Sequence, residues 1–212
     1  MDHRLGRMFC LMLFSLLTTA VFAQQEFSAD LVDNSEKASS TQSKIYAGKD
    51  KLRFEGQQNG RAGTMIINFA AQTTDILIPE RKMYIESTAG HGPAGQRSFN
   101  LFRAADPENA CEEWRKTAAK SGGSCRKIGN ETVNGRSTVK YEGTSEDGTV
   151  NYVWIDPKLH FPVKWQGKDK GNGGELRNIQ EGSQPAGLFV VPPDYQKMDM
   201  GNMGMPGSPP RR

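Results

Sequence analysis

Histidine and cysteine, two residues often used in catalysis and metal binding, are scarce in this sequence. The 212-residue chain has three of each, and it has no G-x-S-x-G, H-E-x-x-H, phosphate-loop or C-x-x-C pattern. His91 lies in a stretch rich in glycine and proline, and His160 precedes Phe161-Pro162; neither has a cluster of potential partners nearby. We therefore expect a protein that is not an enzyme and has neither a catalytic residue nor a cofactor.

An excess of one charge is lacking too. Lysine and arginine number 27 against 24 aspartate and glutamate residues, which leaves a net charge of +3. Proteins that bind nucleic acid usually carry many more basic than acidic groups, clustered on one face. The balanced composition therefore argues against a nucleic-acid partner.

The N-terminal segment Met1–Ala23 has the pattern of a secretory signal peptide. Arg4 and Arg7 precede an apolar run from Met8 to Phe22, and small residues surround the expected cleavage point after Ala23. The alternative, an uncleaved membrane anchor, fits less well because the apolar run is short. We expect a periplasmic or secreted chain of 189 residues with a net charge of +2 and no stable membrane span.

Removal of the signal peptide would take Cys10 with it and leave two cysteines, Cys111 and Cys125. In an exported protein an even pair of cysteines indicates a disulfide. A redox or metal-binding pair is the alternative, but the fourteen-residue separation is not a redox motif and no histidine is nearby in the sequence. We predict a structural disulfide between Cys111 and Cys125.

The stretch from Asp106 to Cys125 is the one convincing helix in the sequence. Asp106 is a good N-cap residue, Pro107 suits the first helical position, and a Gly-Gly pair near the end favours termination. Trp114 belongs to a narrow apolar stripe at helical spacing. One face of this helix is therefore expected to lie on the rest of the protein.

Short segments of strand character surround this helix. Leu52 and Phe54 alternate with charged residues, Asn134-Gly135 predicts a tight hairpin, and Leu188–Val191 is expected to be a closing strand. About ten strands and one helix give the α+β class. A mostly antiparallel sheet of this size needs its apolar side covered, so we expect a strongly curved sheet, an incomplete barrel, with the helix on its concave side. Such a sheet can enclose either a packed core or an apolar cavity.

Two sequence motifs resemble a known superfamily. The stretch W-I-D-P-K-x-x-F-P-V-K-W runs from Trp154 to Trp165, and L-F-V-V-P-P-D-Y-Q-K runs from Leu188 to Lys197. With the order of strands around a mid-chain helix, they resemble the periplasmic lipoprotein-carrier superfamily typified by LolA and LolB, and within it exported domains of unknown function. The resemblance covers Phe27–Lys197. It implies an incomplete barrel with a helical lid and a hydrophobic concave face that can hold acyl chains.

Large apolar side chains on the predicted strands and helix are the candidates for the wall of such a cavity. The alternative is that they fill a packed core. On the first interpretation the protein binds a lipid, a lipoprotein acyl chain or another hydrophobic ligand. On the second it is an envelope scaffold or sensor that contacts a protein partner. The candidate residues are Phe54, Met65, Ile67, Met83, Ile85, Trp114, Tyr141, Tyr152, Trp154 and Trp165.

The last segment, 198–212, differs in composition from the domain predicted at 24–197. It is rich in methionine, glycine and proline, a composition typical of a disordered tail. Thioethers are soft ligands that suit Cu(I), so a copper-binding tail is a further alternative to a plain low-complexity segment. The thioethers concerned are Met198, Met200, Met203 and Met205.

Overall fold

The computed structural model describes residues 25–33, 43–58, 61–88, 106–118, 123–169 and 173–198. The predicted signal peptide and the tail after Met198 lie outside these ranges. Within them the chain forms one α-helix, α2 (Ala110–Ala118), two 3-10 helices, η1 (Pro79–Arg81) and η2 (Ala186–Phe189), and twelve strands. The strands are β1 (Phe27–Asp33), β2 (Ser43–Ala47), β3 (Lys51–Gln58), β4 (Arg61–Asn68), β5 (Thr73–Ile78), β6 (Met83–Thr88), β7 (Ser124–Val133), β8 (Arg136–Thr144), β9 (Val150–Asp156), β10 (Phe161–Gly167), β11 (Gly173–Glu181) and β12 (Gln196–Lys197).

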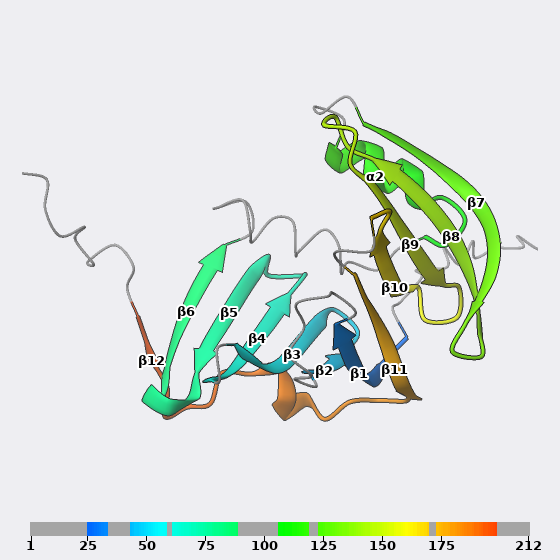
Figure 1. The fold of residues 1–212 in the computed structure, drawn as a ribbon. Coiled ribbons are helices and arrows are strands. Elements are labelled where there is room, and N and C mark those ends of the chain that lie inside the picture. The colour runs from blue at the N-terminus through cyan, green and yellow to red at the C-terminus, as the bar shows by residue number, and fades with distance from the viewer. Residues whose placement is uncertain are drawn as a thin grey trace, which may run out of the picture.

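All twelve strands belong to one open sheet (Figure 1). Their order is β12-β6-β5-β4-β3-β2-β1-β11-β10-β9-β8-β7, and neighbours are antiparallel except for the β12–β6 pair. Strands β1 and β11 pair in the middle and join the N-terminal strands to the C-terminal ones. The predicted class, a curved and mostly antiparallel α+β sheet with one helix, is confirmed, with twelve strands where the sequence suggested about ten.

Local sequence explains several of the connections. The predicted hairpin at Asn134-Gly135 joins β7 to β8, and both residues have positive φ, 48° and 79°, as its two-residue turn requires. The β3–β4 pairing is regular over eight residue pairs, from Lys51–Asn68 to Gln58–Arg61. This regular register fixes which side chains share a face of the sheet.

We call the face of the sheet that carries α2 the inner face and the other one the outer face. Val139 and Tyr141 of β8 lie opposite Ile155 and Val153 of β9, and this cluster packs against Ala110 and Cys111 of α2. Figure 1 shows α2 on the inside of the bend made by β7, β8 and β9. The inner face continues across β10 because Trp165 lies between Val153 and Gly174.

The helix is shorter than the sequence suggested. Its first turn begins at Ala110, preceded by a turn in which the Asp106 carboxylate accepts a hydrogen bond from the Glu108 N–H at 2.9 Å. Cys125 lies in β7 rather than in or just after the helix, because strand pairing with Gly143 extends that far. The predicted disulfide between Cys111 and Cys125 is present and ties α2 to β7.

The closing strand predicted at Leu188–Val191 is wrong. Ala186–Phe189 forms η2 after Pro185, and the chain then reaches the edge of the sheet as the two-residue strand β12. Phe189 inserts its buried ring against Gly48, where a Cβ atom would lie 3.1 Å from the ring. The sequence Pro192-Pro193 cannot donate two successive backbone hydrogen bonds, which disfavours a longer strand here.

Candidate functional site

One row of apolar side chains crosses the inner face from β1 to β6. Residue pairing connects Ala29 to Ile45, Ile45 to Phe54, and so on through Met65 and Ile76 to Ile85. Burial differs along the row: Ala29 and Ile45 are 1% and 0% exposed, whereas Ile76 is 45% exposed. Phe54, Met65 and Ile85 are half-buried. We call Phe54, Met65, Ile76 and Ile85 the apolar strip.

A second inner-face row lies next to the apolar strip, two residues along each strand. Ile78 pairs with Met83 across β5 and β6, and both side chains are half-buried. On β3 and β4 the same row holds a pair of glycines, Gly56 opposite Gly63. A Cβ atom built on Gly63 would meet nothing within 4 Å. The sheet surface is therefore open at Gly63, beside the strip.

The structure divides the ten predicted cavity-lining residues into groups. Phe54, Met65, Met83 and Ile85 are brought together on and beside the apolar strip, and Ile67 lies on the same face in the fully buried core. The remaining five lie in the β7–β11 part of the sheet or on α2: Trp114, Tyr141, Tyr152, Trp154 and Trp165.

Three of those five take part in packing around the helix and its end of the inner face. The Trp114 ring lies 4.0 Å from the position a Cβ atom would take at Gly143, and the buried Tyr141 hydroxyl donates to the Pro107 carbonyl at 2.7 Å. A Cβ atom at Gly174 would lie 2.5 Å from the Trp165 indole, so glycine is required there. These rings fill space between elements of the fold.

Tyr152 and Trp154 lie on the side of β9 away from Val153 and α2. Trp154 belongs to the buried core cluster that contains Ile67, and Tyr152, Phe54 and Met65 pack against that cluster. Trp154 pairs with Lys140 and Lys164, whose ammonium groups each sit 4.8 Å from its ring centroid. Glu131 accepts a hydrogen bond from the Trp154 indole at 2.7 Å and another from Lys140 at 2.8 Å. The Lys140 bond, followed by that of Trp154, lowers the pKa of the Glu131 carboxyl. Trp154 is therefore buried with Glu131, Lys140 and Lys164 as its polar partners.

Sequence reasoning missed Ile76 and Ile78. Both fall in a segment correctly read as a strand, but the period of two does not say which of two neighbouring apolar residues faces inward. The register resolves this, because Ile76 lies between Met65 and Ile85, two residues that were predicted. The signal that identifies Ile76 and Ile78 is their position as cross-strand partners of the predicted residues Met65, Ile85 and Met83.

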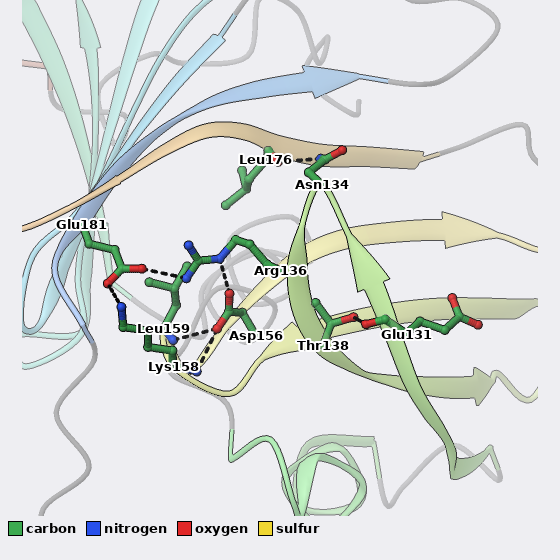
Figure 2. A network of polar contacts seen from close by, with 9 residues as sticks. All are labelled: Glu131, Asn134, Arg136, Thr138, Asp156, Lys158, Leu159, Leu176 and Glu181. Carbon is green, nitrogen blue, oxygen red and sulfur yellow. Dashed lines mark hydrogen bonds and ion pairs between the residues drawn. The ribbon is translucent and has the colours of Figure 1, made fainter.

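A polar network connects the β7–β8 hairpin with the β9–β10 hairpin and with β11 (Figure 2). The Arg136 guanidinium donates to the Asp156 carboxylate and, at 2.9 Å, to Glu181. Lys158 also reaches Glu181, at 2.6 Å, and these two cations, Lys158 first, lower the pKa of Glu181. Asp156 further accepts the backbone N–H groups of Lys158 and Leu159. Every group shown has a partner, so the network supports the fold.

A carboxylate pair on the outer face is less well satisfied. Asp75 lies directly opposite Glu86, and one Asp75 oxygen is buried without a hydrogen-bond partner. Burial, and then repulsion by Glu86, raises the pKa of Asp75, whereas Lys197 opposes the rise. Lys197 forms its ion pair with Glu86 at 2.5 Å. Two carboxylates and one ammonium do not make a metal site.

Among the residues that the structure describes, no group of three or more histidine, cysteine, aspartate or glutamate side chains could hold a metal ion. His160 is in the turn between β9 and β10 at a φ of 52°. Of the tail methionines, Met198 is described, and Met200, Met203 and Met205 lie outside the described ranges. Over those ranges, no helix has the length and apolar character needed to cross a membrane.

No family model matches the sequence, and no curated protein is significantly similar to it. Solved structures do share the fold. An uncharacterized conserved protein from Thermus thermophilus aligns with 82% of this chain and 90% of its own, at 11% identity and a TM-score of 0.54. MucB of Pseudomonas aeruginosa, solved in complex with MucA, aligns with 82% of this chain at 14% identity and a TM-score of 0.51, and this chain spans 58% of it.

A domain from Vibrio parahaemolyticus, described as an outer membrane lipoprotein-sorting protein, also matches, at 13% identity over 79% of this chain and 88% of that one. Its TM-score of 0.33 is too low to carry an argument. At these identities the Thermus thermophilus protein and MucB establish a shared fold alone.

Proposed function

We propose that this protein is exported and binds a hydrophobic ligand, a lipid or the acyl chain of a lipoprotein, on the inner face of its curved sheet. The observation that carries the proposal is the apolar strip, in which four apolar side chains from four adjacent strands line up and Ile76 is 45% exposed. A row of apolar side chains that is only partly buried is a candidate binding surface.

The strip is suited to a flexible apolar chain. Its side chains include one methionine, with a second at Met83 beside it, and methionine adapts its shape to irregular apolar partners. No charged residue occurs in the strip, so a ligand would lose little from desolvation of polar groups there. Covering apolar surface is worth about 25 cal/mol per Å² removed from water.

Export follows from the N-terminal pattern rather than from the fold. Arg4, Arg7 and the apolar run that ends at Ala23 predict a secretory signal peptide, and the Cys111–Cys125 disulfide suits an oxidising compartment. A periplasmic or secreted carrier without catalytic activity is the function that these features support best.

The direct experiment is to purify the protein from its native envelope and extract bound molecules for mass spectrometry. A carrier should retain acyl-chain molecules at a stoichiometry near one, and the same protein refolded after delipidation should take them up again. Protein that copurifies with none, and takes up none after refolding, would contradict the proposal.

A protein partner is the second candidate. The shared fold of MucB, which is solved in complex with MucA, favours it. The same face could then receive apolar side chains of another polypeptide in place of a lipid. The two candidates differ in the extraction experiment, because a scaffold or sensor of this kind should yield no acyl chains and should bind a defined envelope protein in their absence.

A further inference from the structure

The Gly56–Gly63 pair interrupts the apolar surface at a place where the backbone does not need glycine. Neither residue has positive φ, and the β3–β4 register runs through both without a bulge. Glycine inside a regular strand weakens it, and its other common role is to let a ligand or another chain approach the backbone closely. At Gly56 that space is taken by the Ser43 side chain, whereas at Gly63 it is open, so Gly63 points to something that lies on the sheet.

The surroundings of Gly63 describe the shape of the space. Phe54 and Met65 of the apolar strip lie on one side, two residues along the strands, and the β4–β5 register puts Ile78 of β5 beside Gly63. Across β3, the Ser43 side chain reaches over Gly56, where a Cβ atom would lie 2.5 Å from its oxygen. The depression is therefore bounded mainly by apolar groups.

The fourth side carries a charge. Arg61 is two residues before Gly63 on β4, so its side chain leaves the same inner face at the end of the β3–β4 hairpin. Arg61 is exposed to solvent. A ligand that filled the depression with an apolar chain would have its end beside a guanidinium, the side chain best suited to a carboxylate.

We propose that the depression at Gly63 seats a long-chain carboxylate, with its methylene chain on Gly63 beside Phe54 and Met65 and its carboxylate facing Arg61. This assignment rests on the proposed function and makes it specific: the ligand is a single unbranched chain with an anionic end. Gly63 sets the depth available to the chain, and Arg61 selects its end group.

The test uses cis-parinaric acid, a fluorescent long-chain carboxylate, and its uncharged methyl ester as probes for the full-length mature protein. Gly63→Val fills the depression with a side chain that has free space in the absence of ligand and that favours strands. The matched control is Ala62→Val, which adds the same side chain one residue earlier, on the outer face. Gly63→Val should weaken acid binding about tenfold or more without lowering the melting temperature, and Ala62→Val should leave binding unchanged.

Arg61→Gln separates the end group from the chain. It should weaken binding of the acid by about three- to fivefold, the scale of an exposed ion pair, and leave binding of the ester unchanged. If the wild type binds both probes and Gly63→Val does not change their affinity, the binding site proposed at Gly63 is wrong while the proposed function stands. Equal loss in Gly63→Val and Ala62→Val would also overturn that site. If Arg61→Gln binds the acid as tightly as the wild type does, the proposed contact between Arg61 and the ligand carboxylate is wrong. If the wild type binds neither probe, that result counts against the proposed function itself.

Discussion

Replacing Arg136 tests the network that joins the C-terminal hairpins. In Arg136→Met the aliphatic part of the side chain is kept, so the loss reports mainly on the charge and its hydrogen bonds. The Asp156 side chain is 3% exposed and would remain without its cation. Glu181 would keep Lys158 as a partner. The main cost therefore falls on Asp156.

The expected loss in the free energy of unfolding depends on which hydrogen-bond partners Asp156 keeps in Arg136→Met. Removing one partner of a fully buried ion pair costs about 3–5 kcal/mol. Here the Arg136 side chain is 23% exposed, and Asp156 retains hydrogen bonds from the backbone of Lys158 and Leu159 at 2.8 and 3.1 Å. We therefore expect Arg136→Met to lower the free energy of unfolding by about 2–3 kcal/mol.

Urea unfolding followed by circular dichroism measures this, with Arg126→Met as the matched control. Arg126 is also paired across a strand pair, with Glu142 at 2.7 Å, but its side chain is 70% exposed. The control should lose less than about 1 kcal/mol. Equal losses for Arg126→Met and Arg136→Met would refute the reasoning, because burial of Asp156 would then have no energetic consequence.

Three further predictions concern the helix and the outer face. Replacing Cys111 and Cys125 together by serine should lower the free energy of unfolding by about 3 kcal/mol, the chain-entropy value for a separation of 14 residues. Thiol titration of the unfolded wild type from residue 24 onward, which lacks Cys10, should find no free thiol. Tyr141→Phe should cost about 1 kcal/mol in urea unfolding, because the buried hydroxyl bonds the Pro107 carbonyl. Asp75→Asn should raise the melting temperature at pH 7. Because the raised pKa makes the ionised Asp75 destabilising, that gain should vanish as the pH falls toward 3.8, and a gain that persists there would contradict this cause.

Much of the fold could be predicted because its signals are local. The hairpin at Asn134-Gly135 is encoded in two residues that accept positive φ. The pairing of Cys111 with Cys125 could be predicted because they are the two cysteines left once the predicted signal peptide is removed. The helix was placed correctly but made too long, because capping preferences at Asp106 do not show that the first turn ends before the helix begins at Ala110.

The rest depends on contacts that sequence periodicity does not carry. Residues 188–191 are apolar enough for a strand, and the outer-face site for Phe189 at Gly48, which decides their conformation, is 141 positions away in the sequence. Tyr152 and Trp154 alternate as predicted, but only strand pairing places them on the side of β9 away from α2. Tyr152 pairs with Glu142 and Gln166, and Trp154 pairs with Lys140 and Lys164. A period of two separates two faces without saying which one binds.

Ligand binding by the apolar strip is the central claim, and Ile76→Glu tests it most directly. Ile76 is 45% exposed, so a carboxylate is tolerated there without a buried charge, yet it would lie between Met65 and Ile85 in the strip. The matched control is Ile128→Glu. The Ile128 side chain is 43% exposed, much like that of Ile76, and it lies on β7 at the far edge of the sheet. Affinity for a fluorescent acyl probe should fall at least tenfold in Ile76→Glu and stay at the wild-type value in Ile128→Glu. Wild-type affinity in Ile76→Glu, with the fold intact by circular dichroism, would contradict the account.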